Sequence, residues 1–346
     1  INVVNNWVGK AAKELKIRLS NVNIKVSNRE YGAAMDISGG GKTKIELDGQ
    51  NRLDNSQAQA NAGLRKQGEG TLTITDETDD NGNKITAPKS GDSGSLTAKG
   101  ATSNGSAGIG GKTGESTKNI IIEGYATVDA TGGGQGAGIG GGGGTAGHVS
   151  GDAENIIIRG HSNVTATSCD GAAIGGGSSF SHHSSGSATG IWIYGHATVN
   201  ASTSGNGAAI GAADGNRYAE AEVTIGTDGA TAEQEDVHVT ATSKDGAAIG
   251  NGNANTKVII QGHTTIENAF SKYGTAIGGN YYANDSGDMS ITIRDNATIK
   301  KAEVSDEAAN LGKRPAIGAS YANKLVVNIE AVSYTHLRAH ETRRHL

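Results

Sequence analysis

Apolar residues recur at every second position over short stretches along most of the chain. One set of pairs comprises Ile120/Ile122, Ile156/Ile158, Ile191/Ile193, Val258/Ile260 and Ile291/Ile293, and a second set, further along each repeat, comprises Val128/Ala130, Val164/Ala166, Val199/Ala201 and Val239/Ala241. Side chains two positions apart lie on the same face of a β-strand. The pattern therefore predicts two short strands per repeat, each with one apolar face.

A short motif, Ile-Gly preceded by Ala or Gly, recurs seven times between these strand pairs. Its isoleucines are Ile109, Ile139, Ile174, Ile210, Ile249, Ile277 and Ile317. Consecutive copies lie between 28 residues (Ile249 to Ile277) and 40 residues (Ile277 to Ile317) apart, which is the length of one supersecondary unit rather than of a domain. We interpret each copy as a third, very short strand, at a corner where glycine allows a tight bend.

Three short strands with one apolar face each cannot bury that face alone, but stacked repeats can. The sequence therefore predicts an all-β fold, a right-handed parallel β-helix over residues 15–331, with the seven isoleucines as an aliphatic ladder inside it. Met35 and Leu64 occupy the same place in two less regular repeats, so that nine corners, and about nine coils, are expected. Residues 1–14 are expected to form a ragged leading segment.

The glycines also allow a different interpretation. Gly136, Gly138 and Gly141 follow the G-x-G-x-x-G spacing of a dinucleotide-binding loop. Such a loop occurs once, between a strand and a helix, whereas here the motif is repeated and no helical pattern follows it. We therefore do not expect a nucleotide site.

Composition and charge narrow the function classes. The 346 residues include 55 Gly, 2 Pro and only 4% aromatic residues, and the net charge of −5 does not favour nucleic acid or an anionic membrane as a partner. No run of apolar residues is long enough to insert into a membrane. Cys169 is the single cysteine, so an internal disulfide framework is excluded.

The last fifteen residues depart from the repeat pattern. Residues 332–346 contain no glycine and carry a charge of +2, from three Arg and one Glu. Residues 332–342 resemble the translation of a sequencing adapter. We therefore expect 332–346 to be a non-native tail outside the column, with the coil at Leu325–Ile329 left exposed.

The body of the chain resembles a known group of repeat proteins. The segments Leu19–Ile24 and Ile45–Asn51, followed by repeated Gly-Ala-Gly-Ile-Gly-Gly, are similar to β-helical repeat regions of large surface and secreted proteins of gut Firmicutes and Actinobacteria. Several of those proteins are described as carbohydrate-binding or adhesin-like. The resemblance implies a structural, adhesin-like or glycan-binding module of a larger secreted or cell-surface bacterial protein, located outside the cell. Further repeats or domains of the same polypeptide are then its expected partners.

The outward side chains of the first strand of each repeat include an apolar series. We call Ile121, Ile157, Trp192 and Ile259 the apolar stripe. Soluble proteins normally cover such a series, so we expect a neighbouring domain, the loop 175–190 or a polysaccharide on Trp192 and Tyr194 to cover it. Tyr281 and Tyr282, in the loop 279–288, are further candidate glycan ligands.

An enzyme is the alternative, because polysaccharide lyases and hydrolases also use parallel β-helices. Their chemistry requires carboxylates in register on one sheet, and the outward middle positions of the first strand carry none. Glu123 and Arg159 are expected to form a cross-rung ion pair. We expect no catalytic activity here, and a lyase or hydrolase would need a catalytic region largely outside this segment.

Three further groups of residues have side chains of the kind found in metal-binding or ice-binding sites. Asn280, Asp285 and Asp288 supply oxygen atoms of the kind that calcium binds, with ordinary turn chemistry as the alternative; no other cofactor is expected. His161, His196 and His263 follow the same glycine in three repeats, and we interpret them as a ladder of turn residues rather than a metal site. A threonine rank suited to ice, Thr127, Thr198, Thr265 and Thr298, is interrupted by Asn163.

Overall fold

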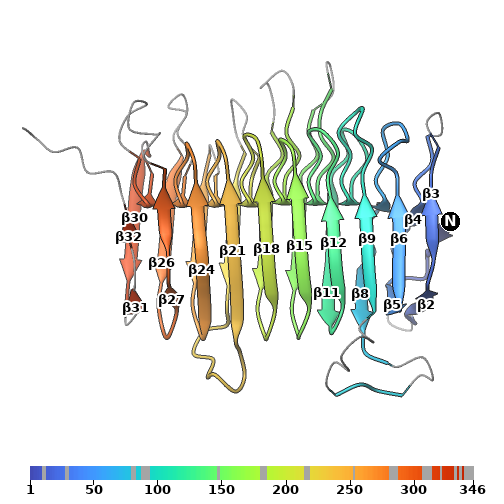
Figure 1. Cartoon of the computed structure of the whole chain (residues 1–346), viewed down its shortest axis with the longest axis horizontal. Coiled ribbons are helices and arrows are strands. Elements are labelled where there is room, and N and C mark those ends of the chain that lie inside the picture. The colour runs from blue at the N-terminus through green and yellow to red at the C-terminus, as the bar shows by residue number, and fades with distance from the viewer. Residues whose placement is uncertain are drawn as a thin grey trace, which may run out of the picture.

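The chain folds into a column of stacked coils (Figure 1). The computed structural model describes residues 1–9, 13–27, 31–78, 83–86, 94–145, 149–179, 185–213, 219–251, 254–279, 287–305, 314–319, 322–330, 333–334 and 337–338. Every strand pairing between coils is parallel, and the strands line up in three sheets that run the length of the column. The parallel β-helix that the sequence predicts is confirmed.

Each coil contributes one strand to sheet A and one to sheet B, and sheet C takes one strand from each of the first eight coils and two short strands from each of the last two. Sheet A contains β1 (Asn2–Val4), β4 (Met35–Ser38), β7 (Leu64–Lys66), β10 (Ile109–Gly110), β13 (Ile139–Gly140), β16 (Ile174–Gly175), β19 (Ile210–Gly211), β22 (Ile249–Gly250), β25 (Ile277–Gly278) and β29 (Ile317–Gly318). Sheet B contains β2 (Leu15–Ser20), β5 (Thr43–Asp48), β8 (Leu72–Asp76), β11 (Thr117–Gly124), β14 (Ala153–Ile158), β17 (Ala188–Ile193), β20 (Ala221–Ile225), β23 (Thr256–Ile260), β26 (Asp288–Ile293) and β30 (Lys324–Ile329).

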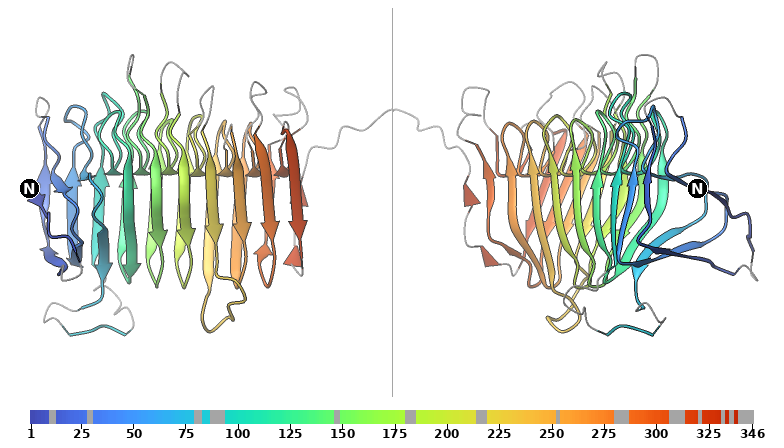
Figure 2. Two further views of the ribbon diagram at one scale, coloured as in Figure 1. Left: turned by 180° about the vertical axis from the view of Figure 1, so that it is seen from behind. Right: turned by 45° about the vertical axis from the view of Figure 1, so that its right-hand side comes forward.

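Sheet C lies beside these two and follows sheet B in each coil. It contains β3 (Asn23–Lys25), β6 (Gln50–Asp54), β9 (Ser95–Lys99), β12 (Thr127–Thr131), β15 (Asn163–Ser168), β18 (Thr198–Thr203), β21 (Val237–Ser243), β24 (Thr264–Ser271), β27 (Thr298–Ile299), β28 (Ala302–Val304), β31 (Ser333–Tyr334) and β32 (Leu337–Arg338). Figure 2 shows the same stacking from behind and at an angle. Two longer connections between sheets B and C leave the column at its lower edge in Figure 1; residues 77–78, 83–86 and 94 are the described part of the first, and residues 226–236 form the second.

The sheets hold ten coils, one more than the nine corners counted in the sequence. The additional coil begins with β1, whose Val3 pairs with Ile37 in β4. Three residues are too few to show a period of two, which is why the sequence pattern did not reveal this strand within the leading segment.

The isoleucines of the repeated motif stack inside the column. Ile139 pairs in register with Ile109 on one side and Ile174 on the other, and the same pairing continues to Ile317. All except Ile317 are fully buried. Ile317 belongs to the last strand of sheet A and is only partly buried, because no further coil covers it.

The glycine that follows each isoleucine is required by the stacking itself. In all seven copies this glycine has a φ angle between +116° and +141°, a region that side chains with a Cβ rarely adopt. A Cβ on Gly140 would also overlap the carbonyl oxygen of Gly175 in the next coil. Only glycine therefore fits at this corner.

Hydroxyl groups satisfy the buried backbone where sheet C turns into sheet A. Ser168, Thr203, Ser243 and Ser271 occupy register-equivalent positions. Their hydroxyls donate to the carbonyl oxygens of Gly136, Gly171, Gly207 and Gly246 at 2.7–3.1 Å. Because a buried carbonyl without a partner costs stability, this inner ladder lets each coil turn sharply without a penalty.

The end of the chain differs in part from expectation. Leu325, Val327 and Ile329 are exposed, at 44%, 38% and 46%, as expected for an uncovered last coil. However, β31 pairs with β27 and β32 with β28, so the backbone of these four tail residues does not leave the column. Strand pairing uses only main-chain groups, and it therefore does not need the side-chain pattern that the tail lacks.

We predict that Gly140→Ala lowers the free energy of unfolding by about 2–5 kcal/mol, because it combines an unfavourable φ with an overlap against backbone. The control is Gly32→Ala, at a position with an ordinary φ and open space around the added carbon, which should change stability by less than about 0.5 kcal/mol. Urea unfolding measures both. Equal stability of the two variants would contradict the role assigned to the corner.

Candidate functional site

The outer face of sheet B brings together the residues singled out in the sequence. Ile121 pairs with Ile157, Ile157 with Trp192, and Trp192 with Thr224. The isoleucines are half-buried, whereas Trp192 is 42% exposed and therefore not covered by the described part of the loop 175–190. The indole stands on a strand held on both sides by hydrogen-bonded neighbours, which fixes its position on the face.

A charged row runs beside the apolar stripe. The Arg159 guanidinium donates to Glu123 Oε2 through Nε at 2.8 Å and Nη2 at 2.6 Å, and to the Tyr194 hydroxyl through Nη1 at 3.0 Å. Partial burial alone would lower the pKa of Arg159, but the bonds to Tyr194 and Glu123 raise it. The expected Glu123–Arg159 pair is present, and Arg159 also binds the hydroxyl of Tyr194, two residues after Trp192.

Three rings are stacked at the turn between sheets B and C. Tyr125 and His161 have ring centroids 4.9 Å apart and His161 and His196 4.6 Å apart, with interplanar angles of 8° and 4°. Burial, and then the neighbouring His196, lowers the pKa of His161. His263 lies outside this stack and contacts Asp236 at 3.5 Å. The stack arises because each ring follows the same left-handed glycine in its coil.

A shallow groove borders the start of the sheet B strands. Its volume is about 570 Å³. Its polar lining is Thr189, Glu220, Glu222, Asn255, Thr256, Lys257, Asp288, Ser290 and Lys324, and its apolar lining is Ala221, Met289 and Val326. Glu222 accepts a bond from Lys257 at 2.8 Å, and Glu220 accepts one from the Asn255 amide at 2.9 Å. Sequence reasoning missed this groove, although a polar residue precedes the first buried residue of each strand here, as in Glu220-Ala221 and Asn255-Thr256.

The proposed calcium and tyrosine sites fall mostly outside the described residues. Asn280, Tyr281, Tyr282 and Asp285 are not among them. Asp288 opens β26 and is exposed, and its N–H donates to Asn255 Oδ1 at 3.2 Å. Within the described ranges, no three His, Cys, Asp or Glu side chains are grouped so that they could hold a metal ion.

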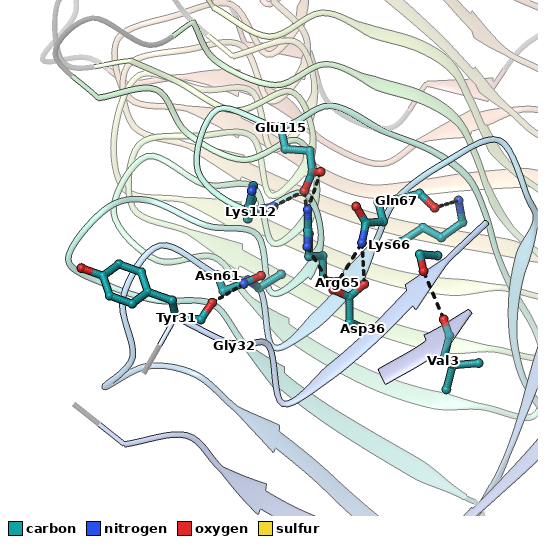
Figure 3. A network of polar contacts seen from close by, with 12 residues as sticks. Val3, Tyr31, Gly32, Asp36, Asn61, Arg65, Lys66, Gln67, Lys112 and Glu115 are labelled. Carbon is teal, nitrogen blue, oxygen red and sulfur yellow. Dashed lines mark hydrogen bonds and ion pairs between the residues drawn. The ribbon is translucent and has the colours of Figure 1, made fainter. Parts of the chain in front are cut away.

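A second polar cluster, which the sequence did not reveal, lies on the outer side of sheet A (Figure 3). Arg65 forms two bonds to Glu115, at 2.8 and 2.7 Å, and one to Asp36 at 3.0 Å. Gln67 also donates to Asp36, at 3.1 Å. The hydrogen bond to Glu115 is the main cause that raises the pKa of Arg65. Both carboxylates are bound by one guanidinium, so the cluster braces three coils and offers no free acid–base pair.

Beneath this cluster, Lys66 points into the column and is 1% exposed. Its Nζ donates to the carbonyl oxygen of Gly68 at 2.9 Å and lies 3.4 Å from that of Gln67 (Figure 3). Burial, together with the charge of Lys118, lowers the pKa of Lys66 to about 8, against the attraction of Glu69. Ile37 occupies the register-equivalent position in the preceding coil, so a cation stands where the pattern expects an aliphatic side chain.

Comparison of the chain with family models, with curated proteins and with solved structures finds no match. No described helix is long and apolar enough to cross a membrane. The geometry of the outer faces is therefore the basis for a functional assignment.

We predict that the stability of the protein rises between about pH 8 and 10.5 through Lys66. In this window the unfolded chain still holds the lysine proton and the folded chain has released it, so the free energy of unfolding increases with pH by about 3 kcal/mol in total. Lys66→Met should remove this contribution and should be the more stable protein at pH 7. Urea unfolding of both proteins from pH 7 to 10.5 tests this, and parallel stability curves would contradict it.

Proposed function

We propose that this parallel β-helix is a glycan-binding structural module of a larger secreted or cell-surface bacterial protein. The observation that carries the proposal is Trp192, which is 42% exposed at an outward position of β17, a strand that is paired on both sides. Aromatic rings present an apolar face with little loss of side-chain entropy on binding. The apolar faces of sugar rings stack on such surfaces.

The neighbours of Trp192 support the same assignment. Tyr194 lies two residues further along the same coil and is held by Arg159 at 3.0 Å. Ile157, in the preceding coil, extends the apolar surface in register. A sugar ring stacked on the indole would therefore contact the apolar Ile157 along the column axis and the hydrogen-bonding Tyr194 along the strand. Carbohydrate recognition needs this combination of apolar and hydrogen-bonding contacts.

Binding is favoured over catalysis by how the carboxylates on this face are engaged. Glu123 is held by Arg159 and Glu222 by Lys257. A general acid or nucleophile must instead face the scissile bond and be free to exchange a proton or attack. A lyase or hydrolase whose catalytic region lies largely outside this segment is the second proposal, and binding by the β-helix is compatible with it.

The resemblance to β-helical surface proteins of gut bacteria supports the proposed setting. A rigid column with an extended face suits attachment to a polymer or to a host-surface glycan, because many weak contacts are repeated along one direction. The proposed location is outside the cell or on its surface.

We predict that Trp192→Ala weakens retention on insoluble polysaccharide by about tenfold or more, because it removes stacking and buried area that together contribute on the order of 1.5–3 kcal/mol. Cellulose, chitin and xylan are the test materials, and binding isotherms are the measurement. Unchanged circular dichroism and melting temperature would show that the fold is intact.

Trp7→Ala provides the matched control, because Trp7 is 55% exposed but lies in the first coil, whereas Trp192 lies in the sixth. It should be retained like the parent protein. If both variants and the parent are retained equally, Trp192 does not bind glycan.

A further inference from the structure

The groove beside sheet B follows the axis of the column. Its lining residues come from five successive strands, β17, β20, β23, β26 and β30, at neighbouring positions of each coil. Lys257 pairs in register with Glu222 on one side and Ser290 on the other. Five coils are four steps of about 4.8 Å, so the groove extends over about 19 Å along the axis.

The chemistry of the groove suits an uncharged ligand with many hydroxyl groups. Lys257 and Glu222 form an ion pair, and Glu220 is engaged by Asn255. Carboxylate, ammonium, amide and hydroxyl groups alternate along the lining, so donors and acceptors are both available and neither sign of charge dominates. Three carboxylates (Glu220, Glu222 and Asp288) and two ammonium groups (Lys257 and Lys324) line the groove, so the charges nearly balance and a strongly charged polymer gains little from them.

The groove ends beside Trp192, which does not itself line it. Thr189 lines the groove and lies on the same strand, β17, three residues before Trp192. Between them Gly190 takes a left-handed φ of +68°, and the equivalent residue of the preceding coil is Asn155, also left-handed at +54°. Because Gly190 has no side chain, nothing of its own separates the indole from the end of the groove. A Cβ there would lie 3.8 Å from the indole nitrogen.

We propose that the groove and Trp192 form one binding path for an extended, neutral, β-1,4-linked polysaccharide chain that runs along the column. This inference rests on the proposed glycan-binding function and adds the shape and direction of the ligand. Strands β20, β23, β26 and β30 pair in register, so the groove is straight over these coils, and the one-residue register shift between β17 and β20 lies at its end, at Thr189 and Gly190. A flat, ribbon-like β-1,4-linked chain can follow it over its length, whereas an α-1,4-linked chain curves away after a short contact.

The test uses the full chain carrying Trp7→Phe, so that Trp192 is its single tryptophan and reports binding by fluorescence. The probes are cellobiose, cellohexaose, chitobiose, chitohexaose and maltohexaose. For at least one β-1,4-linked series the hexasaccharide should bind about tenfold tighter than the disaccharide, because only the longer chain reaches from the indole into the groove. Maltohexaose should bind no tighter than a disaccharide.

Lys257→Ala should weaken binding of the hexasaccharide about fivefold and leave binding of the disaccharide unchanged. Its matched control is Lys300→Ala: Lys300 is similarly exposed and pairs with Glu267 at 2.8 Å, as Lys257 pairs with Glu222, but it follows β27 in sheet C. Exposed ion pairs of this kind contribute little to folding, so both variants should remain folded.

The possible failures are distinguishable. Equal affinity for disaccharide and hexasaccharide, tight binding of maltohexaose, or an equal effect of Lys257→Ala and Lys300→Ala would each overturn the proposed path. If the parent is then still retained on cellulose or chitin through Trp192, the glycan-binding function stands without the path. If neither the soluble probes nor the insoluble polymers bind, both proposals are wrong.

Discussion

The stacking of one coil directly on the next is the constraint on which the rest of the structure depends. At the corner after each buried isoleucine, the carbonyl oxygen of the following coil occupies the space of a side chain, so that only glycine fits. The same contact aligns Ile109, Ile139 and Ile174 into one ladder. Most strand pairs of sheets B and C keep this register as well, with one-residue shifts between β17 and β20 and between β21 and β24.

Exact repetition inside the column leaves its outer face free to vary. Within sheet B the outward position changes from Ile157 to Trp192 to Thr224 over three coils, while the inward neighbours remain aliphatic. A solenoid can therefore acquire a binding surface without changing its core. The polar residues of this face are mostly paired across coils, as in Glu123–Arg159 and Glu222–Lys257, which keeps the surface ordered around the exposed indole.

Two residues, Lys66 and Gly190, depart from this regularity, and their structural consequences differ. Lys66 replaces an inward aliphatic residue, and burial lowers the pKa of its ammonium to about 8. Gly190 replaces an asparagine seen in the preceding coils at a strand start, and it leaves Trp192 open toward the groove. The first departure places a charged group inside the column, whereas the second leaves the core unchanged and alters only the surface.

The sequence by itself determined the inward face of each strand, because a period of two identifies which side chains share a face and the Ile-Gly motif marks every later corner. It also indicated Trp192, Tyr194 and the Glu123–Arg159 pair, because these residues occupy equivalent outward positions in successive repeats. Only the tertiary structure decided which segments become neighbours. Arg65 binds Asp36 and Glu115, 29 and 50 residues away, and the groove is lined by residues of five coils. The repeats vary between 28 and 40 residues in length, so the sequence does not show which outward side chains lie side by side. β1 and the two tail strands were likewise decided by main-chain pairing at the ends of the sheets, which requires no side-chain pattern.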